Sequence, residues 1–172
     1  MPPAIPHLLA PCLALPEETS LILLTSILGA STNWLVTRFL TSTLAASPAT
    51  PVLLVSFLRD LKFFAESSKR LGVDLIKAQA SGTFEFVDGL TGLFTVQSGT
   101  KGSNAQIKGG GTNAIQAAIT EGMKRLKAGG KCLLVIDGLD LVLAGGGDAC
   151  TTSGLHDMLM ELRQVCHLSR YL

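Results

Sequence analysis

The sequence predicts one α/β domain built on a parallel, doubly wound β-sheet flanked by helices. Short apolar runs, typical of strands buried on both faces, alternate with segments whose apolar residues recur at helical spacing. Because helices join parallel strands, this alternation predicts a single open sheet whose crossover connections are right-handed. The 172 residues, 47% of them hydrophobic, are enough to bury one substantial core.

Three predicted strands and two predicted helices fall in the first half of the chain. In order they are strand 21–26 (LILLTS), helix 34–44, strand 51–57 (PVLLVSF), helix 60–71 and strand 84–87 (FEFV). Ser31, Thr32 or Asn33 can cap the first helix, because short polar side chains accept hydrogen bonds from free amides at a helix start. Asp88 and Gly89 predict a turn after the third strand.

The second half begins with a polar stretch rich in glycine. Its predicted elements are a flexible loop at 97–113 (QSGTKGSNAQIKGGGTN), helix 114–127, strand 133–136 and helix 152–168. The loop has too few apolar side chains to build a core. A further strand usually follows such a last helix, so we expect the sheet to lack its C-terminal part. Residues 1–18 are expected to form a proline-rich leader, and residues 19–172 the single domain.

The balance of charged and apolar residues suggests a partner protein. Charged residues make up 16% of the chain, below the usual ~25%, and mean hydropathy is positive. This composition predicts apolar surface that another protein covers. The net charge of +1 argues against a strongly basic nucleic-acid surface, although it permits local patches.

The N-terminus and the cysteines favour a cytoplasmic protein, with the nucleus as a second location. The N-terminal residues include no positive region of a secretory signal, and the longest apolar run is shorter than the ~20 residues that span a membrane. The four cysteines form no CxxC pair and no zinc-ligand spacing, so we expect reduced thiols.

Two segments resemble parts of a P-loop nucleotide hydrolase. Residues 21–33 have the layout of a strand, a tight turn and a helix start, and residues 133–137 (LLVID) resemble the acidic strand end that holds a metal ion. A P-loop needs two glycines followed by Lys and Ser or Thr, because backbone amides and one ammonium surround the phosphates. Gly29 is the only glycine in the turn, and no Lys or Arg precedes Arg38. Asp137 is therefore expected to be a turn carboxylate, and we assign no catalytic, cofactor-binding or metal-binding residue.

Four stretches taken in order resemble a known family. They are NWLVTRFL, PVLLVSFLRDLKFFAESSKRLGVDL, FEFVDGLTGLF and LLVIDGLDLVLA, within residues 20–144. Together they are similar to subunit six of the Elongator complex in its fungal form. Members of that family have a RecA-like fold that has lost the ATPase motifs.

The resemblance implies a structural subunit and not an enzyme. In the family, two copies each of subunits four, five and six form a hetero-hexameric ring of RecA-like domains. The ring docks on the catalytic Elongator core and binds tRNA while the wobble uridine is modified. Subunits four and five, the catalytic core and, through the assembled ring, tRNA are therefore the expected partners.

A local basic patch is the candidate for RNA contact. Residues 89–120 contain no Asp or Glu, and lysines in the loop and in the following helix could meet the phosphate backbone. The residues expected to contact RNA are Lys101, Lys108, Lys124, Arg125 and Lys127. The patch lacks aromatic residues for base stacking, and basic residues at a helix end also suit the helix dipole.

Two alternatives remain open. The first is an active ATPase with an unconventional phosphate loop at 99–102 or 109–112, although neither segment has Lys-Ser/Thr at the required place. The second, prompted by the ending at Leu172, is a degenerate gene product.

Overall fold

The chain folds around an open β-sheet with helices on both faces. The structure is a computed structural model, and it describes residues 7–8, 10–13, 21–27, 29–46, 50–94, 105–107, 111–127, 132–145 and 149–168. The helices are α1 Ala10–Leu13, α2 Asn33–Ala45, α3 Leu61–Arg70, α4 Leu75–Ser81, α5 Gly89–Phe94, α6 Thr112–Arg125, α7 Leu139–Gly145 and α8 Thr152–Leu168. The strands are β1 Val52–Ser56, β2 Phe84–Asp88, β3 Ala105–Gln106 and β4 Leu133–Asp137.

All the strand pairs are parallel, as the sequence predicts. The order across the sheet is β3-β2-β1-β4, so β1 lies between β2 and β4. Val52 stands opposite Phe84 on one side and Leu133 on the other, and Ser56 stands opposite Asp88 and Asp137. The predictions of strands at 51–57, 84–87 and 133–136 are thereby confirmed.

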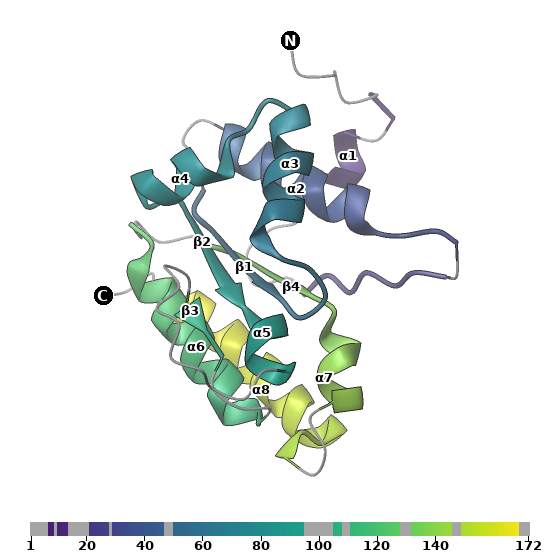
Figure 1. The fold of residues 1–172 in the computed structure, drawn as a ribbon, viewed down its shortest axis with the longest axis vertical. Helices are drawn as coiled ribbons and strands as arrows, with labels where there is room; N and C mark the ends of the chain where they lie inside the picture. Colours follow the sequence, from purple (N-terminus) through teal and green to yellow (C-terminus); the bar gives the residue numbers. More distant parts are fainter. Residues whose placement is uncertain are drawn as a thin grey trace.

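Two hydrophobic cores lie on opposite faces of the sheet (Figure 1). One joins Val52 and Leu54 of β1 to side chains of α2, α3 and α4. The other joins Leu53 and Val55 to side chains of α6, α7 and α8. Because consecutive residues of a strand point to opposite faces, the continuous apolar run of β1 supplies both cores.

The connections give the doubly wound arrangement. From β1 to β2 the chain passes through α3 and α4 on one face. From β3 to β4 it passes through α6 on the other face and moves across the sheet in the opposite direction. Because both the face and the direction are reversed, the two crossovers have the same hand.

The prediction of a strand at 21–26 is wrong. This segment pairs with no strand in the described part of the chain, and the only bridge nearby joins Ile27 to Ala30. Its apolar side chains are largely exposed, among them Leu21, Ile22 and Leu23. An apolar run indicates that a segment favours burial, but a strand also needs a paired neighbour for its backbone groups.

Besides α1 in the leader, three short helices have no counterpart among the predicted elements. Helix α4 begins at Asp74, whose carboxylate accepts from the amides of Ile76 and Lys77, and it ends at Gly82 with a φ of 78°. Helix α5 replaces the turn expected at Asp88 and Gly89. Helix α7 likewise begins where a turn is expected, directly after Gly138. Each has seven residues or fewer, so its helical periodicity is too short to stand out.

The predicted loop at 97–113 contains a strand where the structure describes it. Strand β3 pairs with Val87 and Asp88, and Ile107 after it is buried. A side chain at Gly92 of α5 would overlap the Ile107 carbonyl, so glycine is required for this close approach. Residues 97–104 and 108–110 lie outside the described residues, so the flexibility predicted there stays a prediction.

The four long helices, α2, α3, α6 and α8, match their predictions to within two residues at every end. In the leader, α1 contacts α2. In the described part of the chain, no helix has the length and apolar character that crossing a membrane requires.

Ser68 of α3 gives a direct test of core energetics. Its hydroxyl is buried and has no hydrogen-bond partner, whereas the hydroxyl of neighbouring Ser67 donates to the Phe63 carbonyl at 2.9 Å. We predict that Ser68→Ala raises the free energy of unfolding by about 1 kcal/mol more than Ser67→Ala does, because only Ser68→Ala removes an unsatisfied polar group. Urea denaturation of both variants measures this difference. Equal effects of the two changes would contradict it.

Candidate functional site

The topology points to one end of the sheet. The chain leaves β1 toward β2, whereas β4 joins the other side of β1, so the strand order reverses between β1 and β4. In open α/β sheets, ligands bind outside the carboxyl ends of the strands at this point of reversal. Ser56 and Asp137 are the last residues of β1 and β4, and the register places them side by side.

The Ser56 hydroxyl is fully engaged. It donates to Asp137 Oδ2 at 3.0 Å and accepts from the backbone amide of Arg59 at 2.9 Å. The side chain is buried. The Ser56 hydroxyl thus joins Asp137 to the start of the loop that follows β1.

Arg59 links this site to the first helix. The side-chain amide of Asn33 is oriented with its oxygen toward the neighbouring donors. In this orientation Asn33 Oδ1 accepts from Arg59 Nη2 at 2.6 Å, from Arg59 Nε at 3.2 Å and from the Ser31 hydroxyl at 2.6 Å. The Arg59 guanidinium also lies 4.3 Å from the centre of the Phe63 ring, in a cation–π contact. Its positive charge acts on Asp137 as well. One cation thus connects the start of α2, the end of β1 and the end of β4.

Burial raises the pKa of Asp137 above its ordinary value of 3.8, because desolvation penalises the carboxylate. The hydrogen bond from Ser56 and the charge of Arg59 both lower the pKa, and the nearby Asp140 raises it. The desolvation effect outweighs the two favourable partners. Asp137 is therefore a perturbed acidic group at the point where the fold class places ligands, and carboxylates of this kind gather at functional sites.

The turn before α2 is open around Gly29 and contains no lysine. Gly29 has a φ of 90°, and a Cβ there would meet no atom within 4 Å. The N-cap residue is Thr32, and it makes no side-chain capping hydrogen bond, whereas Ser31 Oγ, one residue earlier, accepts from the Asn33 amide at 3.2 Å. The turn therefore serves to start the helix.

The other acid at this edge has a structural task. Asp88 accepts from the backbone amide of Thr91 at 2.9 Å and from its hydroxyl at 2.7 Å, which fixes the start of α5. Among the described residues, no three His, Cys, Asp or Glu side chains lie close enough together to hold a metal ion.

The residues predicted to contact RNA are only partly described. Lys101 and Lys108 lie outside the described residues. Lys124 and Arg125 are in the last turn of α6, with Lys127 just beyond. Arg125 is paired with Glu85 at 3.5 Å and with Glu121 at 3.8 Å, so acids partly neutralise this end of the patch.

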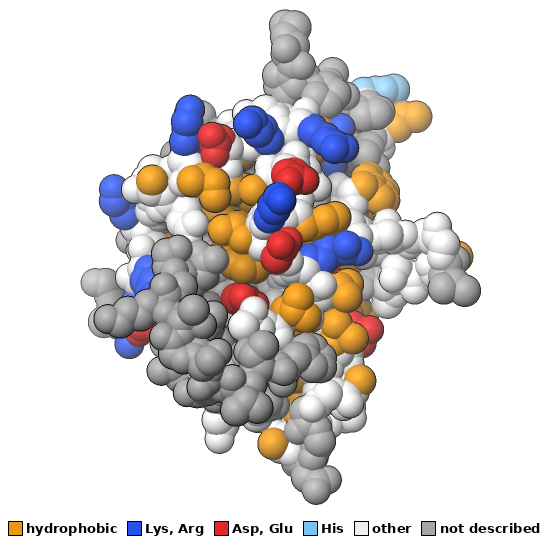
Figure 2. All heavy atoms as spheres, viewed as in Figure 1, with side chains coloured by type: hydrophobic (Ala, Val, Ile, Leu, Met, Phe, Trp, Pro, Cys, Tyr) orange, Lys and Arg blue, Asp and Glu red, His pale blue; other side chains and the backbone are white. Residues whose placement is uncertain are grey.

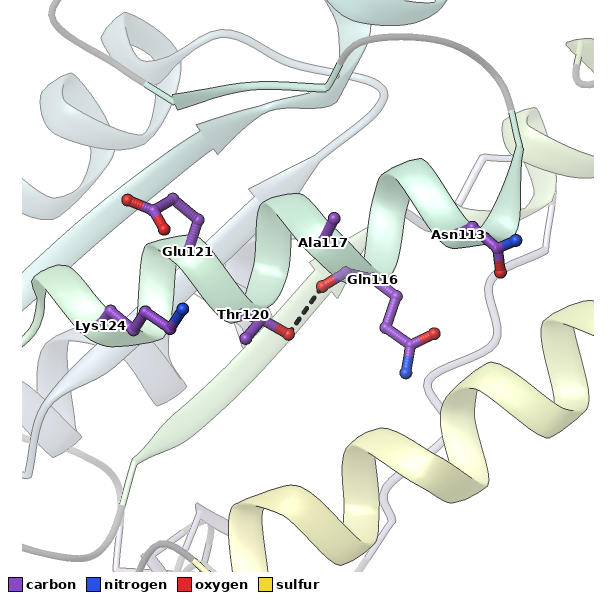
Figure 3. Close-up of a pocket in the computed structure, with 6 residues that line it drawn as sticks. All are labelled: Asn113, Gln116, Ala117, Thr120, Glu121 and Lys124. Carbon is purple, nitrogen blue, oxygen red and sulfur yellow. Dashed lines mark hydrogen bonds between the residues drawn. The ribbon is translucent and has the colours of Figure 1, made fainter.

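A shallow depression of about 590 Å³ lies beside α6 and away from the point of reversal. Figure 3 shows that its residues all come from this one helix and that Gln116 extends toward α8, where its amide donates to Glu161 at 2.7 Å. The lining residues are Asn113, Gln116, Ala117, Thr120, Glu121 and Lys124. They do not converge on a common point, so we assign no site there.

The alternative phosphate loop is also only partly described. Gly111 precedes the first residue of α6 and follows β3 by a few residues, so a glycine segment does connect a strand to a helix here. Residues 99–102 and Gly109 lie outside the described residues. Between β3 and α6 the sequence has one lysine, Lys108, which precedes the glycines, whereas a phosphate-binding lysine follows them.

Comparison of the chain with known protein families, characterised proteins and solved structures found no match.

Sequence patterns single out Asp137 only as a turn carboxylate, and they identify none of its partners. The sequence predicts Asn33 only as a possible helix cap, and no sequence pattern marks Ser56 or Arg59 as a site residue. A usable signal is present, because Ser56 lies near the end of the predicted strand 51–57 and Asp137 directly follows the predicted strand 133–136, and the ends of parallel strands meet at one edge of the sheet. The contact between Arg59 and Asn33 joins separate elements and left no pattern in the sequence.

Asp137 should make stability depend on pH. Its raised pKa means that the folded state holds this proton more tightly than the unfolded state does. The resulting stabilisation is complete below pH 3.8 and is lost as pH rises through the folded-state pKa. We predict that Asp137→Asn raises the unfolding midpoint at neutral pH and reduces the decline in stability as pH increases from acid to neutral.

Urea denaturation at a series of pH values measures this effect. Asp157→Asn on α8 is the control for the loss of one negative charge, because Asp157 is exposed. A lower midpoint for Asp137→Asn at neutral pH would show that ionised Asp137 stabilises the fold, contrary to the expectation.

Proposed function

We propose that this chain is a non-catalytic structural subunit of the Elongator type, with a RecA-like fold. In this proposal it joins subunits four and five in a hetero-hexameric ring, which docks on the catalytic core, binds tRNA and supports modification of the wobble uridine. The closed network of Arg59, Asn33, Ser56 and Asp137 carries the proposal. A nucleotide hydrolase would need open phosphate and metal ligands at this edge, whereas here the chain's own side chains bind one another.

Exposed apolar side chains around the same edge support an assembly role. Trp34 is in the first turn of α2, Leu58 lies two residues after β1, and Leu143 is in α7. Each exposes 40% or more of its surface. Figure 2 shows hydrophobic side chains reaching the surface among the charges over α3 and α4, and again nearer to α7. We assign Trp34, Leu58 and Leu143, the carboxyl-end patch, to contact with a sister RecA-like subunit.

An ATPase with an unconventional phosphate loop is the second candidate. The order of β3, Gly111 and α6 favours it, because a glycine segment there connects a strand to a helix. The closed network and the position of Lys108 before the glycines favour the structural subunit.

The assembly role predicts a defined complex. We expect co-expression of the full chain with Elongator subunits four and five to give a hetero-oligomer of fixed mass, and Trp34→Ala to weaken it at least about tenfold, since buried Trp residues dominate many interfaces. Ile76→Ala is the matched control, because Ile76 exposes 56% of its surface and Trp34 exposes 55%. Co-purification followed by light scattering measures both results. If the chain stays monomeric and binds neither subunit, the proposal is overturned.

The RNA contact has its own test. We expect Lys101→Glu with Lys108→Glu to reduce tRNA binding by the reconstituted ring and to flatten its salt dependence, by about 0.7 in logarithmic slope for each phosphate group that the ring no longer neutralises. Lys62→Glu with Lys69→Glu on α3 changes the net charge equally and serves as the control. Filter binding at several salt concentrations gives both quantities, and equal effects of the two pairs would end the hypothesis.

A further inference from the structure

The two strands beside β1 end in the same sequence. Residues 88–90 and 137–139 both read Asp-Gly-Leu, and each of these DGL segments leads into a short helix, α5 or α7. The sheet register places both aspartates opposite Ser56, the last residue of β1. Because β1 lies between β2 and β4, the DGL segments lie on either side of the chain as it leaves β1 (Figure 1).

The glycine of each DGL segment allows a close approach by one residue after β1. A Cβ at Gly89 would overlap the ring of Phe57, and a Cβ at Gly138 would lie 2.8 Å from Leu58 Cβ and 3.2 Å from Leu58 N. Gly138 also has a φ of 75°, which other residues rarely adopt. The two glycines thus fix where Phe57 and Leu58 lie.

The backbone amides of this stretch are bonded within the chain. Phe57 N donates to the Asp137 carbonyl at 2.9 Å, and the amides of Leu58 and Arg59 donate to Ser56 Oγ at 3.4 and 2.9 Å. Three consecutive amides therefore have partners. An apolar surface can cover this stretch without leaving one of these donors unpaired, which would be costly.

Leu58 is held in place and yet exposed. Phe57 is fully buried, whereas Leu58 exposes 45% of its surface. A side chain on a backbone that is already fixed loses less conformational freedom when a partner buries it, and such preorganisation favours affinity. Leu58 therefore has the properties of an apolar anchor residue in a protein interface.

We propose that Leu58 is the anchor through which the carboxyl-end patch binds a sister subunit, that it enters an apolar pocket of that subunit, and that the two DGL segments hold it in place beforehand. This inference rests on the proposed assembly role. It adds the residue that provides affinity and the chemistry of the partner's pocket. Gly138 is a positioning residue, because it acts through Leu58.

The affinity of the full chain for subunits four and five tests the anchor. We expect Leu58→Ala to weaken binding at least about tenfold, since burial of a leucine side chain in a pocket is lost. Ile76→Ala is the control, because Ile76 lies outside the carboxyl-end patch and exposes 56% of its surface. It should leave the affinity unchanged.

Gly138→Ala tests the positioning. We expect it to weaken binding about tenfold as well, because the added Cβ displaces Leu58 from its preorganised position. Gly82→Ala is the matched control, since Gly82 has a φ of 78° and a Cβ there would meet the flexible side chain of Lys127. Both substitutions strain the backbone and should lower the melting temperature similarly, but only Gly138→Ala should weaken binding.

NMR relaxation of the free chain provides a measurement that does not depend on assembly. We expect an order parameter of about 0.85 for the Leu58 amide, as in rigid backbone, and a value below about 0.6 would overturn the preorganisation. If the unmodified chain binds the two subunits and Leu58→Ala or Gly138→Ala binds equally well, the anchor is overturned and the assembly role stands. If the unmodified chain binds neither subunit, the assembly role fails and the anchor fails with it.

Discussion

Strand β1 organises both halves of the fold. It is paired on both edges and covered on both faces, and all five of its residues are buried. Its alternating side chains supply two separate cores, so its position fixes where α2, α3 and α4 lie on one face and where α6 and α8 lie on the other. A change in the register of β1 would exchange the residues of the two cores, so the packing specifies the register strongly.

The placement of β1 also determines the chemistry at the edge of the sheet. Because β1 ends at Ser56 and β4 ends at Asp137, a hydroxyl and a carboxylate meet where the strand order reverses. Arg59, three residues after the end of β1, brings a positive charge back to this pair and binds the start of α2. The arrangement satisfies the polar groups internally, as expected of a site that joins helices to the sheet, although Asp137 remains ionisable at some cost in desolvation.

Much of the architecture follows from local pattern, and the differences have identifiable causes. Continuous apolar runs predicted β1 and β4, the segment FEFV before the turn residues Asp88 and Gly89 predicted β2, and helical periodicity predicted the four long helices. Helices α4, α5 and α7 are too short for periodicity, although Asp74 and Asp88 are side-chain caps that could have marked two of them. Segment 21–26 has the composition of a strand but lies unpaired, because pairing depends on an edge elsewhere in the chain. The Arg59 contacts likewise join separate elements, and no spacing in the sequence specifies them.

In the proposed function, the contacts among Arg59, Asn33, Ser56 and Asp137 close the carboxyl edge of the sheet to nucleotides, and this closure would distinguish a structural subunit from an ATPase. Isothermal titration calorimetry of the purified chain with magnesium and ATP tests it. We predict no binding heat at millimolar ATP, because Arg59 is already engaged by Asn33 and Asp137, and the Gly29 turn has no lysine. Saturable binding with a micromolar dissociation constant would contradict the closed edge and favour the ATPase interpretation.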